Sequence, residues 1–418
     1  MKKNIALVFV LSVFATTAMP QAVNQKIIAG RVNSKKQEQK PYVILISADG
    51  FRWDYAEKFN AVNLLKFARS GVTAQSMIPS FPSLTFPNHY TLVTGLYPAH
   101  HGLVGNAMFD AKKNESYSLS NRKAVQDSSW YGGTPLWVLA ERQQMLSACF
   151  YWVGSEAAVQ GTRPTYYYDY SDAIKMDDRI AAVKKWLELP EAQRPHLITF
   201  YFPEVDHEAH KYGPDAKETQ DAVHLVDESI GRMVAVIDSL HLPVNYIFVS
   251  DHGMTEIDTT KGIALPAVVD TAEFIIPRGD ALVQLYAKNK TEIQPTYERL
   301  KATAKDYDVY LATNMPAKWH YSKSDDRFNR IGDIILIPHL PFAFRFGNQP
   351  VSPGKHGYDP EIKDMHATFM AWGPQLKKRK RIGAFENVNV YPLISKILGL
   401  TYTDQIDGNI NILKKITR

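Results

Sequence analysis

Six acidic and histidine residues stand where they could bind a metal ion. Five of them come directly or shortly after apolar runs that are typical of buried strands, and the sixth lies in a glycine-flanked loop. They are Asp49, Asp206, His210, Asp251, His252 and, in the loop, His356. Carboxylates and imidazoles together suit zinc and its neighbouring metals. The residue types therefore predict a metal site of the zinc class.

Each of these residues also has a purely structural interpretation. An aspartate at a strand end is commonly a turn former or a helix cap. Asp206 and His210 are four residues apart and could form a surface pair on a helix. Convergence favours the metal site, because several strands would bring acids to one edge of a sheet, where they would repel each other without a cation. The remaining histidines, including His207 and His366, have no pattern of their own that supports a role.

Thr85 is the candidate nucleophile. Pro87 suits the first turn of a short helix that Gly95 would end, which places Thr85 just before a helix N-terminus. Backbone N–H groups and the helix dipole favour an anion there. A threonine hydroxyl is a poor nucleophile near neutral pH, and a divalent metal lowers its pKa. Taken alone, Thr85 is better explained as a cap; beside a metal site it becomes the leading candidate.

The elements that must position these residues alternate between strand and helix. Apolar runs bounded by Gly, Pro or Asp predict strands at residues 41–47, 146–151, 197–202, 246–250 and 367–372. Amphipathic patterns predict helices at residues 63–70, from 134 onward, and at 178–189, 214–240 and 391–398. This alternation predicts an α/β fold with a mostly parallel central sheet flanked by helices, in which ligands bind beyond the carboxyl ends of the strands.

The pattern changes over residues 261–344, where short strands, a polar-faced helix and frequent Pro and Gly predict a smaller α+β insertion. The catalytic core would then comprise residues 41–260 and 345–418. Residues 23–40 are polar and predict a flexible tether. Residues 1–22 have a basic start, an apolar stretch and small residues at its end, which are typical of a secretory signal peptide.

Composition limits the partners and the compartment. The net charge of +5 is small, and the basic run 377–381 is local, which argues against a stable nucleic-acid complex and suggests a solvated loop. Cys149 is the single cysteine, so no intrachain disulfide can form. After signal removal no apolar run is long enough to span a membrane. A secreted protein of the bacterial periplasm fits these features, whereas the oligomeric state stays open.

Several segments resemble the nucleotide pyrophosphatase/phosphodiesterases of the alkaline phosphatase superfamily. The resemblance runs in order from about residue 40 to the C-terminus and suggests a bacterial secreted member. The matching segments are Asp49-Gly-Phe-Arg52, Pro82-Ser-Leu-Thr-Phe-Pro-Asn-His89, Thr94-Gly-Leu-Tyr-Pro98, His101-Gly-Leu-Val-Gly-Asn106, Asp206-His-Glu-Ala-His-Lys-Tyr-Gly-Pro214, Ser250-Asp-His-Gly-Met254 and His356-Gly-Tyr358.

The resemblance implies a role for each matching residue. One Zn²⁺ would be held by Asp206, His210 and His356, and a second by Asp49, Asp251 and His252, with Thr85 bound to the second as the nucleophile. Asn106 and the Thr85 N–H would hold a phosphoryl oxygen. Phe86 and Tyr201 match positions that sandwich a nucleobase, and Tyr170 would line the same pocket. The implied reaction cleaves nucleotide phosphodiester or pyrophosphate bonds to nucleoside 5′-monophosphates through a phosphothreonine intermediate.

Four other functions share parts of this pattern. A phosphomonoesterase or a choline-phosphate/lysophospholipid phosphodiesterase could use the same scaffold, although the apolar, aromatic surroundings of Thr85 suit a bulky ester group. A sulfatase is excluded by the absence of the C/S-x-P-x-R motif around Thr85. A non-catalytic periplasmic binder of a metal or solute would have no need for a hydroxyl beside the metal.

Overall fold

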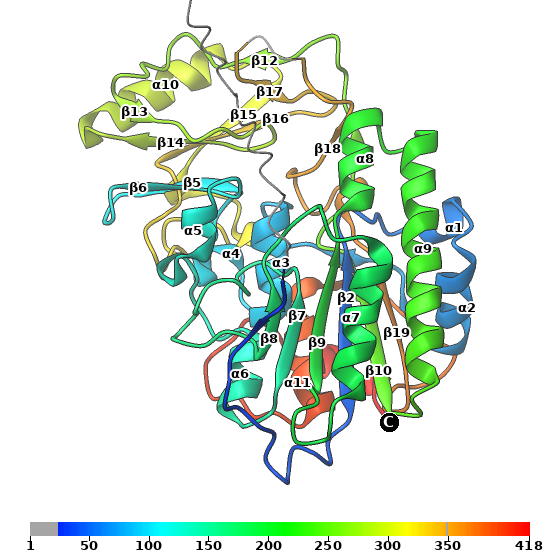
Figure 1. Ribbon diagram of the computed structural model, residues 1–418. Helices are drawn as coiled ribbons and strands as arrows, with labels where there is room; N and C mark the ends of the chain where they lie inside the picture. Colours follow the sequence, from blue (N-terminus) through cyan, green and yellow to red (C-terminus); the bar gives the residue numbers. More distant parts are fainter. Residues whose placement is uncertain (1–23, 348–349) are drawn as a thin grey trace, which may run out of the picture.

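The protein is built around one large mixed sheet that carries helices on both faces (Figure 1). The computed structural model describes residues 24–347 and 350–418. The sheet has nine strands, which in spatial order are β1 (Lys26–Ile27), β8 (Tyr166–Tyr168), β7 (Ser147–Phe150), β9 (Leu197–Phe202), β2 (Tyr42–Ala48), β10 (Val244–Val249), β19 (Phe369–Trp372), β3 (Val72–Ala74) and β20 (Lys380–Ile382).

The five strands from β8 to β10 run parallel, which confirms the predicted mostly parallel sheet. β19 also reads as a buried apolar run, but it pairs antiparallel with both β10 and β3. The apolar run alone does not reveal strand direction, because any strand covered on both faces has this composition.

Side chains of β2 alternate between two apolar cores. Val43 and Leu45 pack on one side of the sheet, and Ile44 and Ile46 on the other. One face is covered by α1 (Tyr55–Lys58), α2 (Val62–Ser70), α7 (Met176–Glu188) and α9 (Lys217–Asp238), and the other by α3 (Thr85–Thr94), α4 (Pro98–His101), α5 (Arg122–Gln126), α6 (Leu136–Arg142), α11 (Val390–Leu398) and α12 (Ile410–Leu413). Burial on both faces explains why the central strands are continuously apolar.

The pairing register brings the strand ends to the same level. Ser47 of β2 pairs with Tyr201 of β9 on one side and with Val249 of β10 on the other. The residues that follow these three strands therefore meet at one edge of the sheet. That edge is the carboxyl end, where open α/β sheets bind ligands.

Residues 263–345 form a smaller unit with its own sheet and apolar core over the same end of the main sheet as α3 and α8 (Glu204–Tyr212) (Figure 1). Its elements are β12 (Ile263–Ala264), β13 (Phe274–Ile275), β14 (Val283–Ala287), α10 (Ile293–Thr303), β15 (Tyr307–Leu311), β16 (Ile334–Pro338) and β17 (Phe344–Arg345). The buried guanidinium of Arg330 fastens the unit to the core, donating to Asp110 at 2.8 Å and to the Trp130 carbonyl at 2.7 Å.

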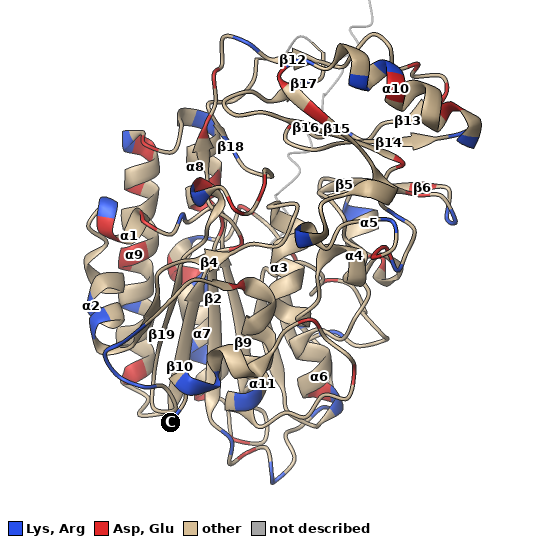
Figure 2. Cartoon of the chain, turned by 180° about the vertical axis from the view of Figure 1, so that it is seen from behind, with Lys and Arg blue, Asp and Glu red and all other residues tan. Residues whose placement is uncertain are grey.

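Short strand pairs complete the fold. They are β4 (Met77–Ile78) with β21 (Phe385–Glu386), β5 (Ala107–Asp110) with β6 (Glu115–Ser118), and β11 (Thr255–Glu256) with β18 (Gly354–Lys355). The basic run 377–381 is exposed, as expected, but its last residues form the edge strand β20 rather than a loop (Figure 2). Charged side chains on an edge strand discourage pairing with another sheet.

Residues 24–40 are not the free tether that their polarity predicts. Lys26 and Ile27 pair with β8, and Asn33 is buried, donating to the carbonyls of Glu191 and Arg194 at 2.8 and 2.7 Å. Polar side chains here satisfy backbone groups of the core, so polarity alone misrepresents the segment. The predicted signal peptide, residues 1–22, lies wholly outside the described residues. Among the helices that are described, none has the length and apolar character to cross a bilayer.

Candidate metal and phosphoryl-transfer site

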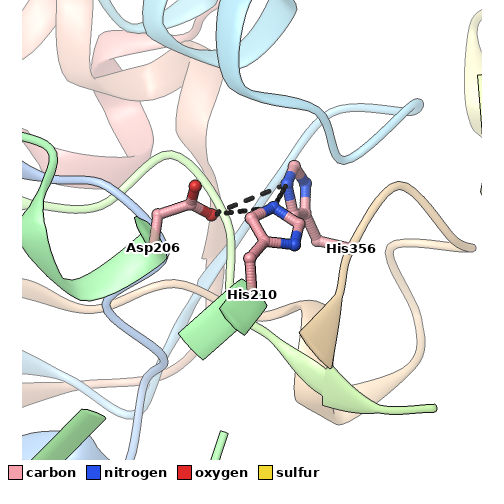
Figure 3. A group of neighbouring side chains, drawn as sticks. All are labelled: Asp206, His210 and His356. Carbon is pink, nitrogen blue, oxygen red and sulfur yellow. Dashed lines mark hydrogen bonds and ion pairs between the residues drawn. The ribbon is translucent and has the colours of Figure 1, made fainter. Parts of the chain in front are cut away.

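Asp206, His210 and His356 meet at the carboxyl edge of the main sheet (Figure 3). Asp206 and His210 lie four residues apart on α8, and His356 follows β18. The two Nε2 atoms are 3.1 Å apart, and Asp206 Oδ1 lies 3.5 Å from His210 Nε2 and 3.6 Å from His356 Nε2. Three potential ligand atoms thus face one point.

Backbone carbonyls set the orientation of both imidazoles. Nδ1 of His210 donates to the Gly354 carbonyl, and Nδ1 of His356 donates to the Ser83 carbonyl, each at 2.8 Å. Nε2 of each ring therefore carries the lone pair that a metal requires. Burial, and then the neighbouring His252 and His210, hold the pKa of His356 well below its ordinary value, which favours the neutral, ligating form.

A second group forms around Asp251 and His252, directly after β10. His252 Nε2 lies 2.9 Å from Asp251 Oδ2 and 3.4 Å from Asp49 Oδ1. The His252 ring is also oriented by the backbone, with Nδ1 donating to the Gly253 carbonyl at 2.8 Å. Asp49, Asp206 and His252 also offer atoms within 4.8 Å of one another, so the two groups are adjacent.

Three carboxylate oxygens of these groups are buried without a hydrogen-bond donor among the described residues. They are Asp49 Oδ1, Asp206 Oδ1 and Asp251 Oδ2. Burial, and then the charges of Asp251 and Asp206, raise the pKa of Asp49 well above its ordinary value. Buried carboxylates without partners are costly unless they coordinate a cation. The residues present therefore fit divalent metal ions of the zinc class.

Thr85 lies beside the second group. Its Oγ1 is 3.2 Å from His252 Nε2, so the hydroxyl shares the point that Asp49 and Asp251 face. Thr85 is the first residue of α3, one position further into the helix than its sequence context predicts, and Leu84 is the N-cap. The Thr85 N–H is one of the helix N-terminal donors that have no partner within the helix.

Asn106 reaches α3 from a loop far along the chain. Its Oδ1 accepts a hydrogen bond from the Phe86 N–H at 2.9 Å. The side chain of Leu84 has no hydrogen-bond acceptor that could cap α3, so Asn106 supplies the cap from outside the helix. Because the amide oxygen is engaged, the orientation of the Asn106 amide nitrogen is fixed, and this group is a donor.

His89 is a site residue that sequence reasoning did not single out. Its Nδ1 lies 3.0 Å from the Thr85 carbonyl oxygen and 3.2 Å from Asp251 Oδ2, and its Nε2 lies 2.9 Å from Ser47 Oγ. Nδ1 therefore carries a proton, which it donates to the Thr85 carbonyl, so it has no lone pair for a metal although it lies close to Asp49 and Asp251. The four-residue spacing from Thr85 on a helix is the signal that could have revealed it.

The three aromatic residues predicted to bind substrate differ in setting. The hydroxyl of Tyr201 donates to Asp49 Oδ2 at 2.6 Å, so this residue also supports a ligand. The Tyr170 side chain is 40% exposed, and its ring centroid lies 6.4 Å from that of Tyr201. Phe86 is half-buried and packs edge-on against Tyr117 at 6.2 Å. Phe86 and Tyr201 thus lie next to Thr85 and Asp49, and Tyr170 lies next to Tyr201. Among the described residues, the rings of Phe86 and Tyr201 do not stack on each other.

The comparison with protein families decides the relationship. A profile of the type I phosphodiesterase / nucleotide pyrophosphatase family matches residues 43–359, which include all of the residues described above. The chain belongs to this family. The resemblance read from its motifs is therefore confirmed.

Relatives of this family member include animal proteins of greater length. It is 34% identical to ectonucleotide pyrophosphatase/phosphodiesterase family member 3 of Rattus norvegicus, over 86% of this chain and 42% of that protein. It is 33% identical to venom phosphodiesterase CdcPDE of Crotalus durissus collilineatus, over 90% of this chain and 47% of that protein. The chain spans about half the length of these curated relatives. An uncharacterized pyrophosphatase/phosphodiesterase of Schizosaccharomyces pombe is 33% identical, over 91% of this chain and 81% of that protein.

Solved structures share the fold over almost the whole chain. Human ectonucleotide pyrophosphatase/phosphodiesterase 5 superposes with a TM-score of 0.84 at 28% identity, covering 90% of this chain and 99% of that one. An inactive threonine-to-alanine variant of the mouse protein, in complex with AMP, superposes with a TM-score of 0.82 at 28% identity, covering 91% of this chain and 100% of that one. The match confirms the predicted alkaline-phosphatase-like α/β fold.

Proposed function

We propose that this family member is a two-zinc hydrolase that cleaves nucleotide phosphodiester or pyrophosphate bonds to nucleoside 5′-monophosphates. The observation that carries the proposal is the position of the Thr85 hydroxyl, 3.2 Å from His252 Nε2 at the N-terminus of α3. A hydroxyl beside a set of unpartnered carboxylates and oriented imidazoles has the surroundings of an activated nucleophile.

The residues divide into two ligand sets. Asp206, His210 and His356 would hold one Zn²⁺, and Asp49, Asp251, His252 and Thr85 the other. When bound, two such ions would lower the pKa of a coordinated hydroxyl and neutralise the charge that develops on a transferred phosphoryl group. The hydroxyl of Tyr201 keeps Asp49 in place, and the His89 ring lies against Asp251 with its Nδ1 bonded to the Thr85 carbonyl.

The chain's own groups define the course of the reaction. Thr85 Oγ1 loses its proton to solvent and attacks phosphorus. At the same time the bond from phosphorus to the leaving oxygen breaks, and the leaving group departs on the side of Asp206, His210 and His356. This gives a phosphothreonine diester. The Asn106 amide and the Thr85 N–H donate to a non-bridging phosphoryl oxygen throughout. A water then attacks phosphorus, the bond to Thr85 breaks, and two in-line displacements leave the configuration at phosphorus retained.

The nucleotide substrate is supported by the relatives and by the aromatic surroundings. An inactive threonine-to-alanine variant of a relative binds AMP, which is the kind of product the reaction would release. Tyr170, Tyr201 and Phe86 offer aromatic surface for a base. A choline-phosphate or lysophospholipid phosphodiesterase, or a phosphomonoesterase, remains the second candidate on the same metal scaffold, and a non-catalytic binder of a metal or solute the third.

Export is part of the proposal. Residues 1–22 would direct the chain to the bacterial periplasm as a cleaved signal peptide, in keeping with relatives named as venom and ecto-enzymes. The partners would be small nucleotide or phosphodiester substrates rather than nucleic acid.

One assay tests the function. Purified protein with Zn²⁺ is offered p-nitrophenyl-TMP, p-nitrophenyl phosphate, ATP and p-nitrophenylphosphorylcholine, with and without EDTA. We expect EDTA-sensitive turnover that is fastest for the nucleotide esters, abolished by Thr85→Ala and unchanged by the control Thr303→Ala on the exposed face of α10. Faster turnover of the monoester would contradict the diesterase, choline preference would favour the second candidate, and an unchanged Thr85→Ala variant would favour the binder.

A further inference from the structure

Six exposed basic side chains gather along one edge of the main sheet. One belongs to α2 and five follow each other in the chain, the last two of these in the edge strand β20: Arg69, Lys377, Lys378, Arg379, Lys380 and Arg381. The N–H groups of Arg379 and Lys380 donate to the Ser70 and Gly71 carbonyls, so the run lies directly against the end of α2 (Figure 2). We call these six residues the basic face.

The charge of the basic face is almost uncompensated. Within residues 24–347 and 350–418, only Arg381 has a carboxylate at ion-pair distance, with Glu57 Oε1 at 3.4 Å. Both side chains of this pair are largely exposed, so water and salt weaken their attraction. Five consecutive like charges repel one another, and an anionic partner would relieve that repulsion.

A hollow of about 800 Å³ adjoins the basic face, between α1 and α2 on one side and β3 and β20 on the other. Arg69, Arg379, Lys380 and Arg381 line it, and Glu57 is the one acidic residue of the lining. The rest of the lining is partly apolar and includes Trp53, Leu65, Ala68, Met370 and Ile382. The hollow thus combines apolar side chains with positive charge.

Trp53 adds an aromatic group to this surface. Its side chain is half-buried, and Lys363 Nζ lies 4.4 Å from the centroid of the indole ring. Tryptophan beside lysine and arginine, next to apolar surface, is typical of proteins that contact the boundary between lipid headgroups and acyl chains. The composition of the hollow therefore fits a phospholipid surface.

The basic face lies apart from the reaction centre. The lining of the hollow contains none of the proposed metal ligands and neither Thr85 nor Asn106. Leu376, directly before the basic run, bridges to Thr417, and this end of the chain lies at the opposite end of the main sheet from α8 (Figure 1). A partner bound at the basic face would leave the reaction centre open to solution.

We propose that the basic face and the adjoining hollow bind the surface of a membrane rich in anionic phospholipids. The cations would contact lipid phosphates, and the apolar lining with Trp53 would contact the region below them. A nucleic acid or an acidic peptide would use the charge alone and leave the apolar lining unexplained. The charged side chains of β20 also oppose the addition of a strand from another protein. This inference goes beyond the proposed function and does not depend on it.

Vesicle binding tests the inference. The purified protein is sedimented with vesicles of phosphatidylcholine alone or of phosphatidylcholine mixed with phosphatidylglycerol, and the partition coefficient is measured. Each Lys or Arg near an anionic surface contributes about fivefold to partitioning, so combined Lys377→Gln, Lys378→Gln, Arg379→Gln and Lys380→Gln should weaken binding to the mixed vesicles more than about 100-fold. A matched control removes the same charge at four exposed positions elsewhere, with Lys112→Gln, Lys123→Gln, Lys185→Gln and Lys301→Gln. This control should bind within about threefold of the unsubstituted protein, because charges more than a Debye length from the membrane are screened.

Further measurements separate charge, lipid and fold. Added NaCl should release the unsubstituted protein from the mixed vesicles, a test that needs no variant. Trp53→Ala should lower partitioning several-fold, because binding scales with buried apolar area, and an unchanged value would exclude the hollow from the contact. Turnover of p-nitrophenyl-TMP should be the same in the fourfold glutamine variant as in the unsubstituted protein, which would show that the variant is folded.

Three outcomes would overturn the inference. The first is equal binding to the two kinds of vesicle, and the second is equal binding of mixed vesicles by the fourfold variant and its matched control. The third is displacement from mixed vesicles by polyglutamate or duplex DNA at an equal concentration of anionic groups, which would assign the basic face to an acidic macromolecule.

Discussion

Asn106 has two roles, capping of α3 and donation to the phosphoryl group, and different substitutions can test each role separately. Its Oδ1 accepts from the Phe86 N–H at 2.9 Å and so caps α3, whereas its amide nitrogen is the proposed donor to the phosphoryl oxygen. Asn106→Ala removes both groups. Asn106→Asp keeps an acceptor for the Phe86 N–H, in a position near a helix N-terminus that favours negative charge, but removes the donor.

The magnitudes follow from these two contacts. Loss of one preorganised donor to an oxyanion typically costs about 2.7–4 kcal/mol, which corresponds to a 10²- to 10³-fold lower kcat. Loss of a helix cap typically costs about 0.5–2 kcal/mol of folding free energy. Asn106→Ala should therefore be both slow and less stable. Asn106→Asp should be at least as slow, because a carboxylate repels the phosphoryl oxygen, and yet unfold at the same urea concentration as the unsubstituted protein.

The assay uses p-nitrophenyl-TMP turnover for kcat and urea unfolding for stability, with zinc content measured on each variant. Both variants should retain their zinc, because Asn106 is in neither ligand set. Turnover by Asn106→Asp within about fivefold of the unsubstituted enzyme would refute the donor role, since the amide donor would then be dispensable. A stability loss in Asn106→Asp equal to that in Asn106→Ala would refute the capping role.

Three further predictions address the metals, Tyr201 and a buried histidine. His356→Ala should lower the zinc content measured by plasma mass spectrometry from about two ions per chain to about one, since the Asp49 group keeps its ligands. Tyr201→Phe should leave the KM for p-nitrophenyl-TMP nearly unchanged but weaken zinc binding about 10- to 100-fold in chelator competition, because the ring stays while the hydrogen bond to Asp49 is lost. Burial lowers the pKa of His101 from 6.5 to about 3. Below about pH 6.5 the unfolded chain therefore binds a proton that the folded chain does not, and stability falls as pH falls, by about 2 kcal/mol from pH 7 to pH 5. Urea unfolding in EDTA should show this loss to be smaller in His101→Gln, and an equal pH dependence in the two proteins would exclude the histidine as its source.

The insertion and the polar N-terminal segment contain contacts that sequence patterns do not predict. Residues 24–40 contain few apolar side chains, and their order comes from hydrogen bonds such as those of Asn33 to carbonyls about 160 residues away. Arg278 and Arg345 are 67 positions apart in the chain and have no local motif. They line one cavity, and their meeting there depends on how the insertion packs over the core. Periodicity reports local burial and contains no information about such long-range contacts.

The metal ligands, in contrast, could be read from the sequence because their positions follow from chain direction. Parallel strands end at one edge of a sheet, so residues after β2, β9 and β10 must lie near each other whatever the details of packing. Asp49, Asp251 and the pair on α8 needed no more than that rule. His356 was indicated by its glycine-flanked loop and Thr85 by its place at a helix start, and the motif resemblance added the role of each.

The sequence by itself therefore determined the family, the α/β class and the chemical types gathered at the strand ends, because these depend on residue type and on strand order. Only the tertiary structure decided the orientation and the hydrogen-bond partners of those groups. Backbone carbonyls orient His210, His252 and His356 with Nε2 toward the metal position. Asn106 caps a helix that begins twenty-one positions earlier in the chain, at Thr85. Apart from the bond of His252 to the neighbouring Gly253, these contacts join segments distant in sequence, and their geometry exists only once the core has packed.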